Sequence, residues 1–156
     1  MPYRVTFDAR MKRTYIIIGS VLLSAFFFLA SCKNKHNTEN NVFEELRNIA
    51  LEVTPAQLGI DLPADSSIVY GVVMDWEMNG STVTLVSYQT GDASLYLSSG
   101  GGVVGGGKHK NVNIAAKKFV ELANNYLDKT AKSEAATLPA TDEVAFYFLS
   151  SKGIYE

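Results

Sequence analysis

The residues best suited to chemistry lie in one glycine-rich segment, residues 98–109, which holds half of the chain's 12 glycines. Glycine loses more backbone entropy on ordering than any other residue, so such a cluster is costly unless the backbone needs positive φ or close approach. The backbone N–H groups of Gly105, Gly106 and Gly107 precede Lys108 and His109 at the start of a predicted helix. This arrangement could hold an anionic or phosphate-bearing ligand.

The same segment fits two nucleotide-binding patterns, but neither is convincing. Residues 102–108 have the spacing G-x4-G-K, yet His109 stands where a magnesium-binding Ser or Thr belongs. Residues 100–105 fit G-x-G-x-x-G, although any polyglycine run does so by chance and no parallel β–α–β unit is evident. We therefore predict no cofactor and favour a structural interpretation. In it Val103 and Val104 plug the core or cover a sheet edge, with Lys108 and His109 at the helix entrance.

Residues for other catalytic or metal chemistry are scarce. The second histidine, His36, lies in a polar stretch far from His109, so a multi-histidine metal site is not expected. Cys32 is the single cysteine, which excludes a disulfide, a zinc cluster or a redox pair within one chain. Asp75 and Glu77 flank Trp76 and are predicted to lie on a solvated face near a turn. We predict no catalytic residue and a domain that is more consistent with a binding protein than an enzyme.

The first 31 residues have the features of a secretory signal peptide. Lys12 and Arg13 precede an uninterrupted apolar run over residues 15–29, and small residues follow it. This run is shorter than the roughly 20 residues that a spanning helix needs. Met11 is the more natural start, because residues 1–10 add nothing to the signal.

The end of this segment, Leu29-Ala30-Ser31-Cys32, resembles the lipobox of bacterial lipoproteins. The resemblance implies that Cys32 is lipidated, that the peptide is cut before it, and that several acyl chains give firm membrane anchoring. Lys33 follows the cysteine, where aspartate is associated with inner-membrane retention, so an outer-membrane location is favoured if the cell has one. Residues 33–40 are polar and asparagine-rich and predict a flexible tether.

Residues 41–156 predict a single α+β domain. Helical spacing of apolar residues begins at Asn41, and a second amphipathic helix follows the glycine-rich segment, with Asn111 or Asn113 as its cap. Strand patterns cover residues 67–78, 81–88, 93–98 and 144–149, and residues 154–155 could add a short pairing. The pattern predicts an antiparallel sheet of about four to five strands, a meander followed by a helix and a strand, packed by two helices.

The dipeptide Asn79-Gly80 fixes the expected pairing of the first two strands. A two-residue type I′ turn there would place Trp76 opposite Val83, Met74 opposite Leu85 and Val72 opposite Ser87. We expect this face to form the core. The opposite face, which includes Val73 and Asp75 on the first strand and Thr84, Val86 and Tyr88 on the second, is mixed and is expected to be partly covered.

Residues 94–109 are similar to a segment S-L-Y-[FL]-S-x-G-G-G-[VI]-[VI]-G-G-G-x-H of a group of uncharacterised bacterial proteins. The resemblance extends over roughly residues 45–155 and implies no activity. From Cys32 onward the chain has ten Lys and Arg against fifteen Asp and Glu, a net charge of −5. This balance disfavours non-specific binding to nucleic acid or to an anionic lipid surface.

These observations together predict an envelope lipoprotein, anchored to the membrane through the lipid on Cys32, with a small non-enzymatic domain that binds a partner, plausibly a protein. A special case is an immunity or inhibitor protein that neutralises a toxin at the membrane. The alternative is an anion-binding or enzymatic domain that uses the loop with Lys108 and His109.

The substitution Cys32→Ser should release the protein from membranes, because it removes the sulfur that would carry the lipid. The measurement is the share of the chain that sediments with membranes after cell fractionation, with Ser31→Ala as the matched control that keeps the lipobox. Continued membrane association of the Cys32→Ser chain would contradict lipidation.

Overall fold

The computed structural model describes the backbone from Lys33 to Glu156 and the side chains from Val42 onward. The predicted signal peptide, the start at Met11 and the lipidation site Cys32 lie outside the described residues. Glu39–Glu156 form one compact unit, which contains every core residue described below. None of the described helices is long and apolar enough to cross a bilayer.

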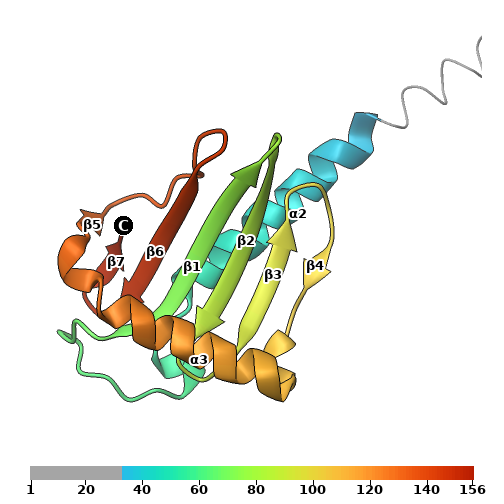
Figure 1. The fold of residues 1–156 in the computed structure, drawn as a ribbon. Coiled ribbons are helices and arrows are strands. Elements are labelled where there is room, and N and C mark those ends of the chain that lie inside the picture. The colour runs from blue at the N-terminus through green and yellow to red at the C-terminus, as the bar shows by residue number, and fades with distance from the viewer. Residues whose placement is uncertain (1–32) are drawn as a thin grey trace, which may run out of the picture. The chain divides into compact units, whose positions relative to one another are not determined.

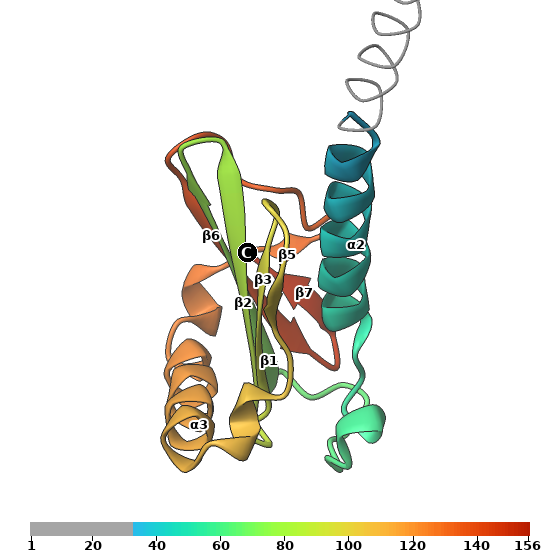
Figure 2. The ribbon, with the colours of Figure 1, turned by 90° about the vertical axis from the view of Figure 1, so that its right-hand side faces the viewer.

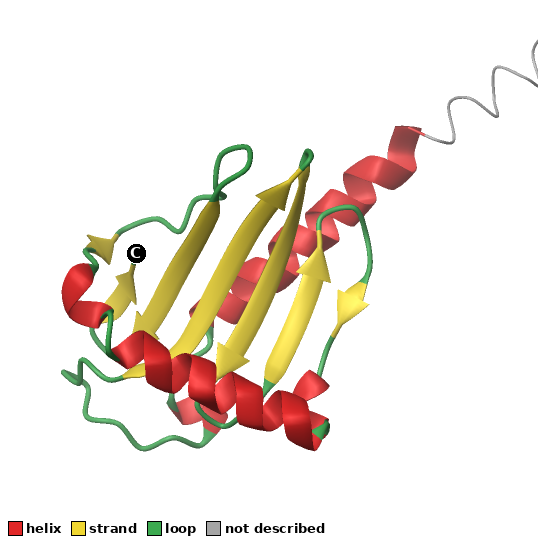
Figure 3. Cartoon of the chain, in the orientation of Figure 1, coloured by secondary structure: helices red, strands yellow, loops and turns green. Residues whose placement is uncertain are grey.

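The domain is built on one seven-stranded antiparallel sheet (Figures 1 and 3). The strands are β1 (Val69–Met78), β2 (Ser81–Tyr88), β3 (Ala93–Leu97), β4 (Gly102–Val103), β5 (Lys132–Ser133), β6 (Val144–Ser150) and β7 (Gly153–Tyr155). Their order across the sheet is β4-β3-β2-β1-β6-β7-β5. The prediction of four to five strands is too low, because β4 and β5 have only two residues each and leave no alternating pattern in the sequence.

Two α-helices cover the sheet, as predicted, and they lie on opposite faces (Figure 2). These are α2 (Lys33–Glu52) and α3 (Lys110–Asn124); three short 3-10 helices are η1 (Ala56–Leu58), η2 (Gly106–Lys108) and η3 (Leu127–Lys129). The α+β class is therefore confirmed. The predicted helix start at Asn41 is wrong, since the backbone is helical from Lys33. The apolar spacing that marks a helix begins only where α2 reaches the core at Phe43, so the polar turns before it carried no signal.

The predicted register of the hairpin is confirmed, and the predicted core face is buried at Val72, which packs in a core cluster with Val120 and Phe148, but not at Trp76. Trp76 pairs with Val83, Met74 with Leu85 and Val72 with Ser87. The side chain of Trp76 is nevertheless 44% exposed, whereas Val73 and Thr84 on the opposite face are fully buried. The reason is that α2 packs against that opposite face through Phe43, Arg47 and Ala50.

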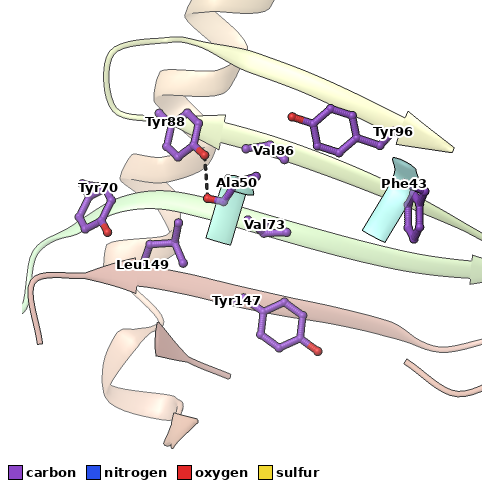
Figure 4. Packing of buried hydrophobic residues seen from close by; sticks show 9 residues of the cluster. All are labelled: Phe43, Ala50, Tyr70, Val73, Val86, Tyr88, Tyr96, Tyr147 and Leu149. Carbon is purple, nitrogen blue, oxygen red and sulfur yellow. Dashed lines mark hydrogen bonds between the residues drawn. The ribbon is translucent and has the colours of Figure 1, made fainter. Parts of the chain in front are cut away.

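The core on the α2 side is a single cluster that joins the helix to four strands (Figure 4). Its buried members are Phe43, Ala50, Tyr70, Val73, Val86, Tyr88, Tyr96, Tyr147 and Leu149. The Tyr88 hydroxyl donates to the Ala50 carbonyl at 2.8 Å, and the Tyr70 hydroxyl donates to the Val53 carbonyl at 2.8 Å. These two bonds satisfy carbonyl groups at the C-terminal end of α2. The last carbonyls of a helix have no N–H partner within the helix itself. Burial raises the pKa of both phenols, so they stay neutral donors.

A buried ion pair lies under α2. The Arg47 Nε donates to Asp75 Oδ2 at 2.7 Å, and the Thr84 hydroxyl donates to Asp75 Oδ1 at 2.5 Å. The guanidinium carbon of Arg47 also lies 5.4 Å from the centroid of the Tyr147 ring. Asp75 is fully buried, so its predicted place on a solvated face is wrong. The partners of the Asp75 carboxylate come from two other elements, Arg47 from α2 and Thr84 from β2.

Glu77 is the second carboxylate whose predicted solvated position is wrong. It is buried, and its two oxygens accept from the N–H groups of Gly80, at 2.5 Å, and Asp142, at 2.6 Å. One side chain thus ties the β1–β2 turn to the segment before β6. Both carboxylates have structural partners, and neither is available as an acid or base for a ligand.

The substitution Arg47→Met should lower the free energy of unfolding by about 3–5 kcal/mol, because it leaves the Asp75 charge buried without its partner. Urea unfolding monitored by circular dichroism measures this loss. The triple variant Arg47→Met, Asp75→Val, Thr84→Val should recover most of it, since a buried pair replaced by apolar residues of similar volume is often neutral. A single-variant loss under about 1 kcal/mol would contradict the role given to the ion pair.

Candidate functional site

The glycine-rich segment closes one edge of the sheet. After β3 the chain reverses, and Gly102 and Val103 pair with Tyr96 and Leu95 as the edge strand β4. Gly100 and Gly101 in the reversal have φ angles of 105° and 83°, in the region that favours glycine. The structural interpretation, in which this segment covers a sheet edge, is therefore confirmed.

The second glycine triplet, residues 105–107, allows the chain to pass against the turn between β2 and β3. A Cβ atom added to Gly107 would lie 2.3 Å from the Gly91 carbonyl oxygen and 2.8 Å from the Asp92 Cα. Gly106 also approaches the Ala93 carbonyl, at 3.3 Å from an added Cβ. Close contact between backbones thus explains this triplet without any ligand.

The valines between the triplets do not plug the core. Val103 is 56% exposed and Val104 is 73% exposed, so that part of the structural expectation is wrong. Both valines lie at an edge strand with no element packed over them, whereas a core plug would need a cover. The backbone of Val103 pairs with β3, and its side chain remains accessible.

Lys108 and His109 lie at the entrance of α3, as predicted, and both are exposed. His109 is the residue before the first turn, and its side chain makes no cap hydrogen bond. The predicted caps Asn111 and Asn113 are wrong: both lie within the helix, and the Asn113 amide instead donates to the Thr90 carbonyl at 3.3 Å. The predicted anion-binding residues therefore lie together at the entrance of α3, where no side chain makes a cap hydrogen bond.

A different surface, which the sequence assigned to the core, is left uncovered. We call it the open face and define it by two rows of apolar side chains on the α3 side of the sheet. The first row is Val144, Trp76, Val83 and Leu97, and the second is Phe146, Met74, Leu85, Leu95 and Val103. In Figure 1, α3 crosses the opposite ends of these strands and leaves the hairpin half without a helix. The open face runs over five strands without a charged residue.

The exposure of the open face is substantial. Val144 is 44% exposed, Phe146 40% and Trp76 44%, while the remaining β2 and β3 members are half-buried by one another. Val72, which lies on the same strand as Trp76, is by contrast fully buried under α3. Contiguous exposed apolar surface of this kind is uncommon on monomeric proteins, whereas single exposed apolar side chains are ordinary.

One side of α3 borders the open face and stands above the sheet as a wall. A groove of about 580 Å³ runs between α3 and β6; its apolar lining comes from Phe119, Leu122, Ala123, Tyr126, Val144, Phe146 and Phe148. Leu122 is 51% exposed and Tyr126 47% exposed. The other side of α3 is polar, and there Asn124 accepts from the Val69 N–H at 2.9 Å. α3 therefore has an apolar surface wider than its contact with the sheet requires.

The polar groups at this groove are Lys129, Thr130 and Glu156. The Lys129 ammonium lies 4.8 Å from the centroid of the Tyr126 ring and so stays near the wall. Lys118, one turn before Leu122 on α3, is exposed but is not among the residues that line the groove. The groove therefore has an apolar floor with one basic and one acidic residue, Lys129 and Glu156, at its edge.

The sequence did contain a signal for this site. Among the apolar residues of the predicted second helix, Ala116 and Ala123 are buried, whereas Leu122 is exposed, as is Tyr126 just beyond the end of α3. A stripe wider than one buried face, next to a sheet that is apolar on both sides, indicates an uncovered surface. No cluster of three His, Cys, Asp or Glu side chains able to hold a metal is found among the described residues. In comparisons with protein-family models, curated proteins and solved structures, nothing matches this chain.

The substitution Gly107→Ala should lower the free energy of unfolding by about 2–3 kcal/mol, because the added methyl group has no room beside the Gly91 carbonyl. The control Gly101→Ala has open space, and its positive φ should cost only about 1 kcal/mol. Denaturant titrations of both variants measure the difference. Equal costs would contradict the assignment of Gly107 to backbone packing.

Proposed function

We propose that this chain is a lipid-anchored protein of the bacterial envelope whose folded domain is a non-enzymatic module that binds a partner protein on the open face. The observation that carries the proposal is the open face itself. Two cross-strand rows of apolar side chains lie beside an apolar helix wall, and no described element covers them.

Burial energetics support a binding surface. Removing a large apolar side chain from water stabilises the buried state by roughly 1.5–3 kcal/mol. Trp76, Phe146 and Leu122 forgo much of this in the isolated domain, since each is at least 40% exposed. Aromatic side chains at the centre of an apolar patch are also the commonest energetic anchors of protein interfaces.

The polar residues of the domain support binding in preference to catalysis. Asp75 and Glu77 are committed to structural partners, and the Ser98 hydroxyl accepts from the Thr82 N–H at 2.7 Å. His109 lies exposed at the start of α3. These groups are separated from the open face, whose members carry no acid, base or nucleophile.

The lipobox at Leu29-Ala30-Ser31-Cys32 supports the envelope location, with Lys33 favouring the outer membrane where one exists. A protein held there through the lipid on Cys32 would meet its partner at the membrane. Neutralisation of a toxin, as by an immunity or inhibitor protein, is one role that such a domain would suit.

The alternative function is binding of an anion or phosphate-bearing ligand at Gly105, Gly106, Gly107, Lys108 and His109. In its favour, Lys108 and His109 are exposed beside the N-terminus of α3, which no side chain caps. Millimolar phosphate should raise the melting temperature if this alternative holds. Under our main proposal phosphate should leave the melting temperature unchanged.

A photo-crosslinking amino acid in place of Trp76 should form an adduct with one protein in living cells, because Trp76 lies in the middle of the first row. The purified partner should then bind the domain in calorimetry, and Phe146→Lys should weaken that binding by about tenfold or more. The matched control is Ile49→Lys, which also charges an exposed apolar residue but on α2, and it should bind normally.

Loss of partner binding in His109→Ala, with normal binding in Phe146→Lys, would contradict the open face as the binding surface and favour the glycine loop. The melting temperature of each variant checks that it folds. We expect little change, because Phe146, Ile49 and His109 are all exposed.

A further inference from the structure

We infer that Asn79 is a site of spontaneous deamidation, and that the Glu77 carboxylate keeps it unreactive while the domain is folded. In this reaction the backbone nitrogen of Gly80 attacks the side-chain carbonyl carbon of Asn79 and closes a five-membered succinimide ring. The proton of the Gly80 N–H leaves with the side-chain nitrogen as ammonia. Water then opens the ring at either carbonyl group, which produces aspartate or isoaspartate at position 79.

The residue types make Asn79 the most reactive asparagine of the chain. It is the only one of the ten asparagines that precedes a glycine. The attacking nitrogen must come close to the side-chain carbonyl, and glycine has no Cβ atom to obstruct this approach. Asn113, by contrast, precedes the bulky Ile114. The dipeptide Asn79-Gly80 is therefore the place where this chemistry is expected first.

The turn is also open to the water that the second step needs. Asn79 and Gly80 are both exposed at the end of the β1–β2 hairpin. A Cβ atom added to Gly80 would have no heavy atom within 4 Å, so the ring has room to form. Composition and exposure alone would thus leave this dipeptide free to react.

One hydrogen bond ties up the attacking nitrogen. Glu77 Oε1 accepts from the Gly80 N–H at 2.5 Å, and the Glu77 side chain is only 7% exposed. The carboxylate is itself held in place, because Oε2 accepts from the Asp142 N–H at 2.6 Å. The Glu77 N–H also donates to the Glu143 carbonyl at 3.0 Å. In Figure 1 the hairpin turn and the segment before β6 lie at the same end of the sheet.

This bond opposes the first step for two reasons. Negative charge develops on the Gly80 nitrogen as its proton is lost, and a carboxylate beside it disfavours a second negative charge. A hydrogen bond to an ionised acceptor is also stronger than a neutral one, so the nitrogen is costly to release. The reaction therefore waits for a local opening in which Gly80 leaves Glu77.

The two products differ in their effect on the fold. Asn79 has a φ of 54° and Gly80 a φ of 82°, and aspartate tolerates a positive φ almost as well as asparagine does. Isoaspartate instead adds a methylene group to the backbone. A two-residue turn fixes the pairing register, so this longer backbone would displace Trp76 from its position opposite Val83. Isoaspartate formation would thus disturb the first row of the open face.

The test follows deamidation in the chain from residue 32 that carries Cys32→Ser, incubated in mildly alkaline buffer. Peptide mapping by mass spectrometry measures the gain of one dalton at Asn79, and an isoaspartyl methyltransferase detects isoaspartate. The folded chain should react at least about tenfold more slowly than the same chain in urea. Glu77→Gln, which keeps the shape of the side chain but removes its charge, should raise the folded rate by about fivefold or more.

Two further variants separate the carboxylate from general stability. Glu77→Ala should raise the folded rate at least as far as Glu77→Gln, and circular dichroism shows whether each variant is folded; if the alanine variant is not, the glutamine variant decides. Gly107→Ala is the matched control, because it is expected to destabilise the domain far from this turn and should react as slowly as the parent chain. All of the variants should react at the same rate in urea.

Four outcomes would overturn the inference. An absence of reaction at Asn79 in urea would remove the site, and equal rates with and without urea would show that the fold does not protect it. Protection that survives in folded Glu77→Gln and Glu77→Ala would assign it to the turn conformation. An equal increase in Gly107→Ala and Glu77→Gln would assign it to global stability.

Discussion

Val72 and Val73 are adjacent in the central strand β1, and both are fully buried. Successive side chains of a strand point to opposite faces, so the sheet must be covered on both sides to bury this pair. α2 and α3 provide the two covers (Figure 2). The rest of the structure depends on how far each cover extends. α2 packs along its face from Phe43 to Ala50, whereas α3 crosses its face at one end of the strands, and Trp76 four residues beyond Val72 is half exposed.

The fully covered face is held in place by polar groups as well as by apolar packing. The Arg47–Asp75 pair joins two elements that are 28 residues apart in the chain, and Thr84 supplies the second partner of the carboxylate. A charged pair in an apolar layer contributes little net stability, but a displaced helix would leave both charges buried and unpaired. The tyrosine bonds to the end of α2 act in the same way. These polar contacts therefore fix the position of α2 on the sheet, and the position of α2 determines which residues of that face are buried.

The glycine-rich segment and the open face are parts of one arrangement. The reversal at Gly100 and Gly101 returns the chain along β3, and Val103 then extends the second apolar row by one strand. The second triplet brings the chain past the β2–β3 turn and into α3, whose side is the wall of the groove. Glycines that resemble a phosphate loop in the sequence thus shape an apolar surface, because their small size lets backbone pass close to backbone.

Local pattern alone determined the α+β class, the five longer strands and the register of the hairpin, because Asn79-Gly80 permits one tight turn and alternation fixes the rest. It also placed Lys108 and His109 at the start of α3. Only the tertiary structure decided how far each face of the sheet is buried. Both faces of β1 and β2 carry apolar residues, so alternation could not rank them, and the partners of Asp75 and Glu77 come from α2, β2 and the loop before β6. Burial depends on which helix docks where, and that is a contact between elements far apart in the chain.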